Sequence, residues 1–256
     1  MAAQSTHRRP VAAWLERVGQ LGQMVGETLY HLAIGNVDLR DTLKQMVALG
    51  VESIPIVLII AGFTGMVFSL QVSQEFDRFG AASLIGQLLG LAVIREFGPV
   101  LTGVVVAGRA GSAIAAELGT MKVTEQVDAL RALAASPVQY LVVPRFLACV
   151  VMVPVLTVFA NLIGMIGGYV VAVHQVGIIP AVFIESVTDY LVLWDLVGSI
   201  IKAAVFGILI AVVSCYRGLQ TERGAQGVGD STIASVVTGM ISIFVTNYLL
   251  SALLYR

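Results

Sequence analysis

The sequence predicts a single all-α integral membrane domain over residues 1–256, and three observations support this. Of its residues, 57% are hydrophobic and only 12% are charged, whereas an ordinary soluble domain has about 25% charged residues. Long charge-free runs recur, and a helix needs roughly 20 apolar residues to cross the hydrocarbon core of a bilayer. These runs are continuous and not alternating, which excludes a strand-based barrel.

The first element is an amphipathic helix, predicted over residues 11–34. Its apolar residues recur at steps of three and four, and polar residues fall between them. One face is too polar for the helix to span, so we expect it to lie in the membrane interface with Trp14 as an anchor. A soluble helix packed on a partner protein is the alternative. The apolar residues are Trp14, Val18, Leu21, Val25, Leu29 and Leu32.

Five membrane-spanning helices follow. Three lie in charge-free runs, at residues 53–74, 146–173 and 231–255. The other two, at residues 84–116 and 191–216, are long enough but contain charged residues. Ionisable residues inside a span are costly and usually face a cavity or a partner charge, so they are the first candidates for function. They are Arg95, Glu96, Arg109, Asp195 and Lys202.

Small residues four apart predict close contacts between these helices, as in Gly86 and Gly90 or Gly164 and Gly168. The spacing is common in membrane helices, so it indicates a tight bundle without identifying a partner.

The positions of Lys and Arg predict the orientation, because short cytoplasmic loops carry an excess of both. They gather before the first span and after the second and the fourth. Residues 174–195 contain acidic residues but no Lys or Arg, and the loop after the first span adds only Arg78. The N-terminus is therefore predicted to be cytoplasmic and the C-terminus periplasmic. The basic residues are Arg8, Arg9, Arg17, Arg40, Lys44, Lys122, Arg131, Arg145, Arg217 and Arg223.

The most polar stretch, residues 117–145, predicts a short amphipathic helix over residues 124–135 on the cytoplasmic side. Thr124 is the expected N-cap, acidic residues favour the first turn, and Ser136-Pro137 ends the helix. Because this helix is joined to two spanning helices, it can transmit a movement of a soluble partner to the membrane domain.

Two runs in this part of the chain resemble the signature of the MlaE-type permeases. They are Arg95-Glu96-Phe97-Gly98-Pro99 and, from Gly108, GRAGSAIAAELGTMKVTEQVDALRALAASPVQYLVVPR. That family comprises the membrane subunits of phospholipid ABC importers or exporters in Gram-negative bacteria and chloroplasts. The length, the amphipathic helix and the five spans also agree with the family.

The resemblance implies transport of phospholipids between inner and outer membranes, which maintains the lipid asymmetry of the outer membrane. It implies a homodimer assembled with two cytoplasmic ABC ATPase subunits and a ring of MCE-domain substrate-binding proteins. A small STAS-type accessory subunit is a further candidate partner. Because no transit peptide is recognised, we expect a bacterial inner membrane and not a plastid envelope.

Two sets of site residues follow from the resemblance and the predicted depths. The position matching Glu96 belongs to the family's lipid pocket, and Lys202 lies at a similar predicted depth in the fourth span. The predicted substrate-binding residues are therefore Arg95, Glu96, Phe97 and Lys202, with a structural ion pair as the alternative. The segment matching residues 124–135 is the family's coupling helix, which docks on the ATPase; a merely solvated helix face is the alternative. The predicted coupling residues are Thr124, Glu125, Asp128, Leu130 and Arg131.

The chain has no GxxxxGK[ST] phosphate loop, so we expect no cofactor in this chain, no catalytic residues and ATP hydrolysis by a partner subunit. No spacing suggests a metal site, and Cys149 and Cys215 are expected to be buried. Arg109 and Glu117 lie eight residues apart, close to one helix face. Both are expected to have a structural role near the headgroups or to shape the junction with the coupling helix.

The sequence gives less support to two other functions. An ATPase-independent secondary transporter of lipids or small molecules is expected to show internal repeats, and none is evident. An intramembrane hydrolase would need Ser112 beside His174, but the predicted topology places these residues toward opposite ends of their helices. The net charge of −1 gives no indication of a nucleic-acid partner.

Overall fold

The computed structural model describes residues 10–35, 37–78, 84–222 and 224–255, without the side chains of residues 10–14, 17, 77 and 78. Every regular element in these ranges is helical. Five stretches are long and apolar enough to cross a membrane, which confirms the predicted fold class. They are Leu39–Phe76, Ile85–Val123, Val138–His174, Leu193–Leu219 and Gly224–Leu254.

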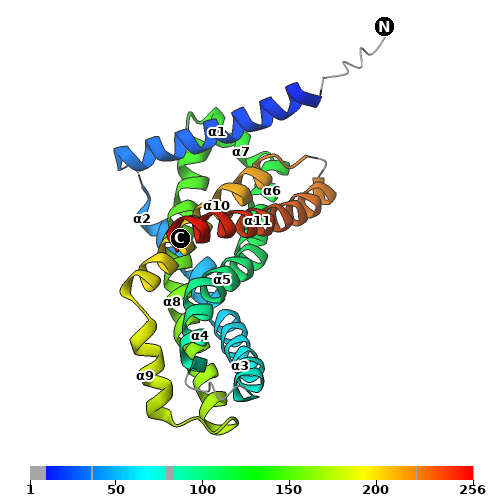
Figure 1. The fold of residues 1–256 in the computed structure, drawn as a ribbon. Coiled ribbons are helices and arrows are strands. Elements are labelled where there is room, and N and C mark those ends of the chain that lie inside the picture. Colours follow the sequence, from blue (N-terminus) through cyan, green and yellow to red (C-terminus); the bar gives the residue numbers. More distant parts are fainter. Residues whose placement is uncertain (1–9, 36, 79–83, 223, 256) are drawn as a thin grey trace.

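The first three stretches are each built from several helical pieces (Figure 1). The α-helices are α1 (Pro10–Ile34), α2 (Leu39–Gln45), α3 (Ile54–Arg78), α4 (Ile85–Ala92), α5 (Gly98–Val106), α6 (Ser112–Val123), α7 (Gln126–Ala132), α8 (Val143–His174), α9 (Pro180–Tyr190), α10 (Leu193–Leu219) and α11 (Gly224–Leu254). Wider π-helical turns connect some of them, at Met46–Gly50, Val93–Phe97, Ala107–Gly111 and Val138–Val142, and Val51–Ser53 is a 3-10 turn.

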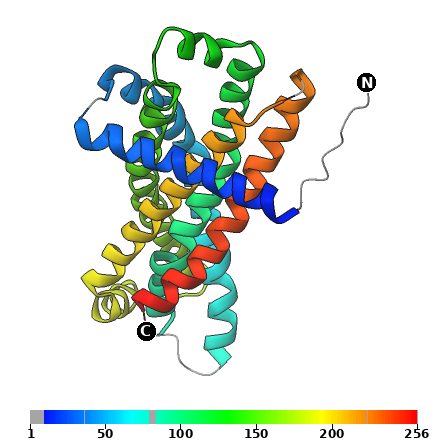
Figure 2. The same ribbon diagram turned by 90° about the horizontal axis from the view of Figure 1, so that it is seen from above.

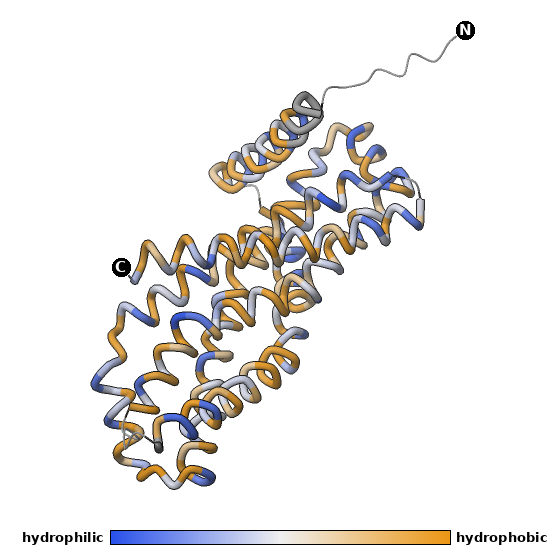
Figure 3. The backbone as a smooth tube through the Cα atoms, turned by 45° about the vertical axis from the view of Figure 1, so that its right-hand side comes forward, coloured by the Kyte–Doolittle hydropathy of each residue, from blue (hydrophilic) through white to orange (hydrophobic). Residues whose placement is uncertain are grey.

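The long helices form one bundle in which α8 packs against both α3 and α10. The short helix α7 lies at one end, and α9 lies beside α8 at the other (Figure 1). We call these the α7 end and the α9 end. Helix α1 crosses the bundle near the α7 end (Figure 2), where Gln220 donates a hydrogen bond to Gln20 at 2.8 Å. Apolar residues dominate the long helices, and hydrophilic residues are most frequent toward the two ends (Figure 3).

Glycines set the close approach of α3 and α8. A Cβ placed on Gly65 would overlap the carbonyl oxygen of Gly164. Where α8 meets α4, one placed on Gly168 would overlap the Leu89 side chain. Gly164 and Gly168 are two of the small residues that the sequence singled out. Burial of apolar side chains does not drive helices together inside a membrane, because lipid tails are as apolar as leucine. Van der Waals contacts between closely packed backbones supply part of the energy of association instead.

The elements differ from the predicted ones in several places. A helix forms over Pro10–Ile34 as expected, although the side chain of Trp14 and residues Arg8, Arg9 and Arg223 lie outside the described part of the chain. The first long stretch begins at Leu39, well before residue 53. Helix α9 was not predicted; Pro180 at its first turn starts it, and extended backbone at Leu191 and Val192 separates it from α10.

The predicted helix over residues 124–135 is shorter, and Thr124 is not its N-cap. Helix α6 runs on to Val123, so the Thr124 hydroxyl donates back to the Thr120 carbonyl oxygen at 2.8 Å. The chain turns at Glu125, which has φ 61° and occupies the N-cap position of α7. Ala134, with φ 56°, stops the helix after Ala132.

Candidate functional site

Four charged residues of the second and fourth spanning stretches converge on one site and form two ion pairs. Arg95 Nε lies 2.8 Å from Asp195 Oδ1, and Lys202 Nζ lies 2.9 Å from Glu96 Oε1. Each pair joins the π-helical turn Val93–Phe97 to α10. Because charges inside a membrane protein need a partner, the pairing explains how these residues are tolerated. The pair of Glu96 with Lys202 is the structural ion pair that stood as the alternative to a shared lipid cavity, whereas the pair of Arg95 with Asp195 was not predicted.

The local backbone explains why Lys202 is held at this position. Pro99 has no N–H group, so the carbonyl oxygen of Arg95, four residues earlier, cannot receive the usual helical hydrogen bond. Lys202 Nζ donates to that oxygen at 2.7 Å. The wider π-helical turn occurs at the same place, as is frequent at functional sites. Pro99, four residues after Arg95, therefore indicates from the sequence alone that the Arg95 carbonyl oxygen lacks its helical hydrogen bond.

Lys202 is completely buried, with 0% of its side chain exposed. Its three N–H donors are used by the Arg95 carbonyl oxygen, Glu96 Oε1 and, at 2.7 Å, Ser251 Oγ. An ammonium group has only three donors. Lys202 therefore lies behind Glu96, orients it and has no donor left for a ligand.

Helix α11 supplies two side chains that the sequence analysis missed. Asn247 Nδ2 donates to Glu96 Oε2 and Ser251 Oγ donates to Glu96 Oε1, both at 2.8 Å. They lie one helical turn apart on a span that also carries several other Ser and Thr residues. The Glu96 carboxylate thus has three donors from two helices, which fix its position.

Arg95 is held differently and keeps two nitrogens free. Its Nε is taken by Asp195, and its Cζ lies 4.6 Å from the centroid of the Tyr255 ring. The two terminal nitrogens have no hydrogen-bond partner in the described ranges, and 32% of the side chain is exposed. Asp195 itself is buried, and its other oxygen accepts from the Val192 backbone N–H at the start of α10.

A cavity of about 510 Å³ opens beside these groups, between α3, α4 and the C-terminal end of α11. Arg95, Glu96, Ser251 and Tyr255 give it one polar wall, and Lys202 is not part of its lining. The remaining wall is apolar. It consists of Phe68, Val72, Phe76, Leu88, Leu91 and Ala92.

Phe97 lies in a second cavity, of about 320 Å³, that follows α3 from Phe63 to Gln71. Phe68 lines both cavities and packs edge-on against Phe97, with ring centroids 5.2 Å apart. The polar cavity and the cavity at Phe97 are therefore neighbours, separated by one aromatic pair. The four predicted substrate-binding residues are close in space, but only Arg95 and Glu96 share a cavity wall.

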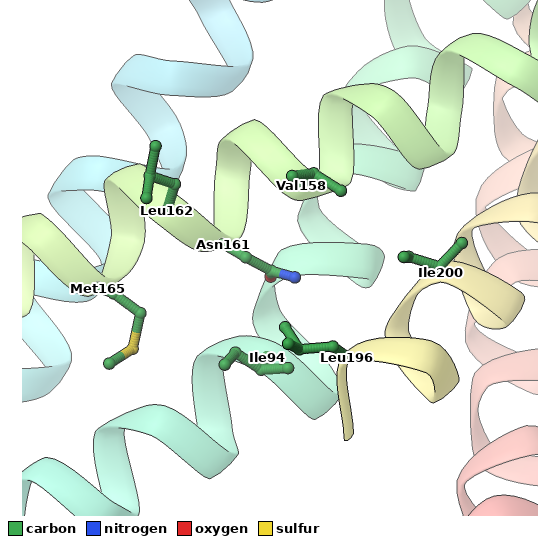
Figure 4. A pocket seen from close by; sticks show the side chains of 7 residues that line it. All are labelled: Ile94, Val158, Asn161, Leu162, Met165, Leu196 and Ile200. Carbon is green, nitrogen blue, oxygen red and sulfur yellow. The ribbon is translucent and has the colours of Figure 1, made fainter. Parts of the chain in front are cut away.

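A third hollow, of about 240 Å³, lies on the other side of the π-helical turn, between α8 and α10. Figure 4 shows Asn161 pointing between Val158, Ile94 and Leu196. Asn161 donates to Ser199 Oγ at 3.1 Å. No ionisable side chain lines this hollow within the described residues, so it lacks the charges of the cavity at Arg95 and Glu96.

At the α7 end, the charged residues of the predicted coupling helix are exposed. Lys122 Nζ lies 3.0 Å from Asp128 Oδ2, and Arg131 Nη1 lies 3.2 Å from Asp128 Oδ1. The hydrogen bond from Lys122 holds the pKa of Asp128 below its usual value. Leu130 packs partly against the core. Leu133, which sequence reasoning missed, is the apolar tip of this element, with 78% of its surface exposed.

Two further ion pairs brace α6, on which α7 is mounted. Arg145 Nη2 of α8 lies 2.7 Å from Glu117 Oε2 of α6, and the Arg145 side chain is buried. Arg109 Nη2 lies 2.6 Å from Glu52 Oε2 and also donates to Ser53 Oγ. Arg109 thus pairs with a residue before α3, and Glu117 pairs with α8. Both pairs fit the structural role that was expected for Arg109 and Glu117.

The hydrolase alternative has no geometric support. Ser112 Oγ donates to the Arg109 carbonyl oxygen, and His174 Nδ1 lies 3.2 Å from the Val170 carbonyl oxygen of its own helix. His174 is the last residue of α8, at the α9 end, so it is far from Ser112. Cys149 and Cys215 are buried, as predicted.

Comparison with known proteins agrees with this architecture. The family model described as Permease MlaE matches residues 42–253. A probable ABC transporter permease protein of Synechocystis sp. is 46% identical over 97% of this chain and 95% of its own length. One of Rickettsia typhi is 42% identical over 84% of this chain and 83% of its own. The chloroplastic Arabidopsis thaliana protein TRIGALACTOSYLDIACYLGLYCEROL 1 is 40% identical over 91% and 67%, respectively. The chain belongs to the MlaE permease family and is an ABC transporter permease.

Proposed function

We propose that this permease moves phospholipids between the inner and outer membranes and so maintains the lipid asymmetry of the outer membrane. The observation that supports this best is the amphiphilic cavity, in which Arg95 and Glu96 form one wall and aromatic and aliphatic side chains form the rest. A diacyl phospholipid has the matching division into a charged headgroup and apolar chains. The name of the Arabidopsis relative refers to a galactosyl diacylglycerol, which favours a substrate with two acyl chains on glycerol but does not specify its headgroup.

The proposed roles of the site residues follow from their positions. Arg95 and Glu96 contact the headgroup, and Phe97 contacts an acyl chain in the neighbouring cavity. Lys202 acts indirectly, because it is buried behind Glu96 and fixes that carboxylate. Arg95 and Glu96 keep hydrogen-bonding positions that their partners do not fill, so the cavity favours a polar ligand group over acyl chains alone.

The proposed energy source is a separate cytoplasmic ABC ATPase dimer that docks on α7. The helix presents Asp128, Arg131 and the exposed apolar Leu133, a combination that suits a protein interface. Its support on α6, braced by Arg145 and Glu117, suits transmission of a push into the spans. The further proposed partners are a second copy of this chain, an MCE-domain protein ring and a small STAS-type subunit, all at a bacterial inner membrane with the N-terminus cytoplasmic.

Purification of the tagged full chain from its native membranes in mild detergent tests this function. We expect an ATPase, an MCE-domain protein and phospholipid to copurify with it. Recovery of the chain with lipid but without any ATPase, at detergent concentrations that preserve other ABC complexes, would instead favour an ATPase-independent secondary transporter.

A further inference from the structure

Among the described residues, the charges around the cavity cancel, and only one of each sign lines the ligand space. Arg95 is neutralised by Asp195 and Glu96 by Lys202. Lys202 and Asp195 are almost completely buried, at 0% and 2% exposure. They therefore neutralise Glu96 and Arg95 without lining the cavity themselves. Within the described part of the chain, the cavity therefore presents one cation and one anion to its ligand, and the four charges of the site sum to zero.

The Arg95 side chain is prepared to bind a phosphate. Asp195 occupies Nε, and the face of the Tyr255 ring restricts the plane of the guanidinium. The two terminal nitrogens remain without partners in the described part of the chain and border the cavity. A guanidinium edge with free donors matches the geometry of phosphate oxygens and binds them in bidentate fashion.

Glu96 is prepared to accept one more donor. An ionised carboxylate offers about four acceptor positions. Lys202, Asn247 and Ser251 occupy three of them and hold the carboxylate in place. The remaining position suits an ammonium group.

The two binding groups are close together. The centroid of the Tyr255 ring lies 4.6 Å from Arg95 Cζ and 5.0 Å from Lys202 Nζ, and that ammonium is 2.9 Å from Glu96 Oε1. One short headgroup can therefore reach both Arg95 and Glu96.

Charge balance then decides which headgroup fits. An anionic headgroup would leave the neutral site with one uncompensated negative charge in a cavity whose remaining wall is apolar, whereas a zwitterionic headgroup adds no net charge. We infer that the cavity selects phospholipids with zwitterionic headgroups, with the phosphate on Arg95 and the ammonium on Glu96. This inference rests on the proposed function, since it specifies the lipid class for the same cavity.

The test uses the purified full chain in nanodiscs that contain equal amounts of phosphatidylethanolamine and phosphatidylglycerol with the same acyl chains. Lipids retained by the protein after transfer to detergent are counted by native mass spectrometry. We expect the wild type to retain phosphatidylethanolamine over phosphatidylglycerol by about tenfold, which corresponds to a free-energy difference of about 1.4 kcal/mol.

Single substitutions change the charge balance in a stated direction. Glu96→Gln removes the ammonium acceptor and leaves a net positive site, so the ratio should shift toward phosphatidylglycerol. Asp195→Asn also leaves a net positive site but keeps Glu96, so we expect a smaller shift in the same direction. Glu185→Gln removes a negative charge from the exposed surface of α9, outside the cavity, and should retain the wild-type ratio.

A double variant, Glu96→Gln with Lys202→Met, keeps the site neutral and avoids a buried unpaired ammonium. It should still favour phosphatidylethanolamine, because the neutral site disfavours an anionic headgroup, but by a smaller ratio than the wild type, because the ammonium acceptor is gone. It provides the test if Glu96→Gln alone does not fold. A wild type that retains no phospholipid would contradict the proposed function. A wild type that retains both lipids equally, or Glu96 and Asp195 variants that keep the wild-type ratio, would contradict only the inference about the headgroup.

Discussion

At the scale of residues, the ion pair of Glu96 and Lys202 is asymmetric, and this has a measurable consequence. Lys202 has no exposed surface, whereas 39% of the Glu96 side chain is exposed. Removing the partner of a fully buried charge typically costs about 3–5 kcal/mol. Glu96→Ala leaves Lys202 charged and buried, while Lys202→Met leaves Glu96 beside the cavity with two remaining donors.

We therefore predict that Glu96→Ala lowers the thermal unfolding temperature of the purified full chain clearly more than Lys202→Met does. Differential scanning fluorimetry in one detergent measures both. If both variants lowered the unfolding temperature equally, the loss of either partner would cost the same stability, which would contradict the prediction from their different burial.

Ser251 gives a second prediction, because its hydroxyl accepts from Lys202 and donates to Glu96. Ser251→Ala leaves one Lys202 donor unsatisfied, and a buried unsatisfied group costs about 1–3 kcal/mol. Ser242→Ala on the same helix is the matched control, because its hydroxyl donates only to the Thr238 carbonyl oxygen of its own helix. A lower unfolding temperature is expected for the first variant only. Similar values for both would show that the Ser251 bridge adds no stability.

Part of this site could be predicted from the sequence and part could not. Charged residues in an apolar run can be recognised directly in the sequence, so Arg95, Glu96 and Lys202 were found. Which of them pair depends on the rotation and tilt of each helix. A π-helical turn at Val93–Phe97 alters that rotation and has no clear residue pattern. Asn247 and Ser251 were missed because polar, uncharged residues do not stand out in a span.

At the scale of elements, the contact of α3 with α8 depends on glycine. A Cβ on Gly65 would overlap the backbone of Gly164, and backbone cannot move aside as a flexible side chain can. We predict that Gly65→Ala destabilises the protein by about 1–3 kcal/mol, the usual cost of overpacking. Gly22→Ala in α1 is the control, because no atom lies within 4 Å of its added Cβ. There the better helix propensity of alanine should leave stability unchanged or raise it by up to about 1 kcal/mol. The unfolding temperatures of the two variants provide the comparison.

Helix α7 supports a prediction about function. Leu133 is highly exposed at its tip, and Asp128 and Arg131 form an exposed pair beside it. In the proposed transporter, Leu133→Asp and the double reversal Asp128→Arg with Arg131→Asp should reduce copurification of the ATPase by about tenfold or more, since buried apolar anchors dominate interfaces. The unfolding temperature should not change, because these side chains contribute little to the core.

Leu130→Asp is the contrasting variant, because Leu130 packs partly against the core and its loss should lower stability as well. Full ATPase recovery with Leu133→Asp would exclude α7 as the docking element.

The elements themselves were predictable to different degrees. Hydropathy revealed five spans because a bilayer requires long apolar helices, whatever their packing. Helix α9 was missed because its 11 residues mix Glu185 and Asp189 with apolar residues and are too few for a clear periodic pattern. Thr124 was assigned to the wrong helix end because a Thr hydroxyl can cap a helix start or bond back to the preceding turn.

At the scale of the whole molecule, the bundle separates the two kinds of loop. The Lys- and Arg-containing connections after the second and fourth spans lie at the α7 end, and the acidic helix α9 lies at the other. By the positive-inside rule the α7 end should face the cytoplasm. The same orientation is required for an ATPase to reach α7, so charge distribution and proposed mechanism can be tested together.

Single cysteines at the two ends provide that test without removing the native ones, since Cys149 and Cys215 are buried and should not react. We predict that Thr188→Cys, exposed on α9, is labelled by a membrane-impermeant maleimide in spheroplasts. Glu222→Cys, exposed between α10 and α11, should be labelled only after the membrane is permeabilised. The unmodified chain controls for the buried cysteines and should remain unlabelled in both conditions. The reverse pattern would place α7 outside the cell, where no ATP is available, and would exclude both the predicted orientation and an ATPase-driven mechanism through α7.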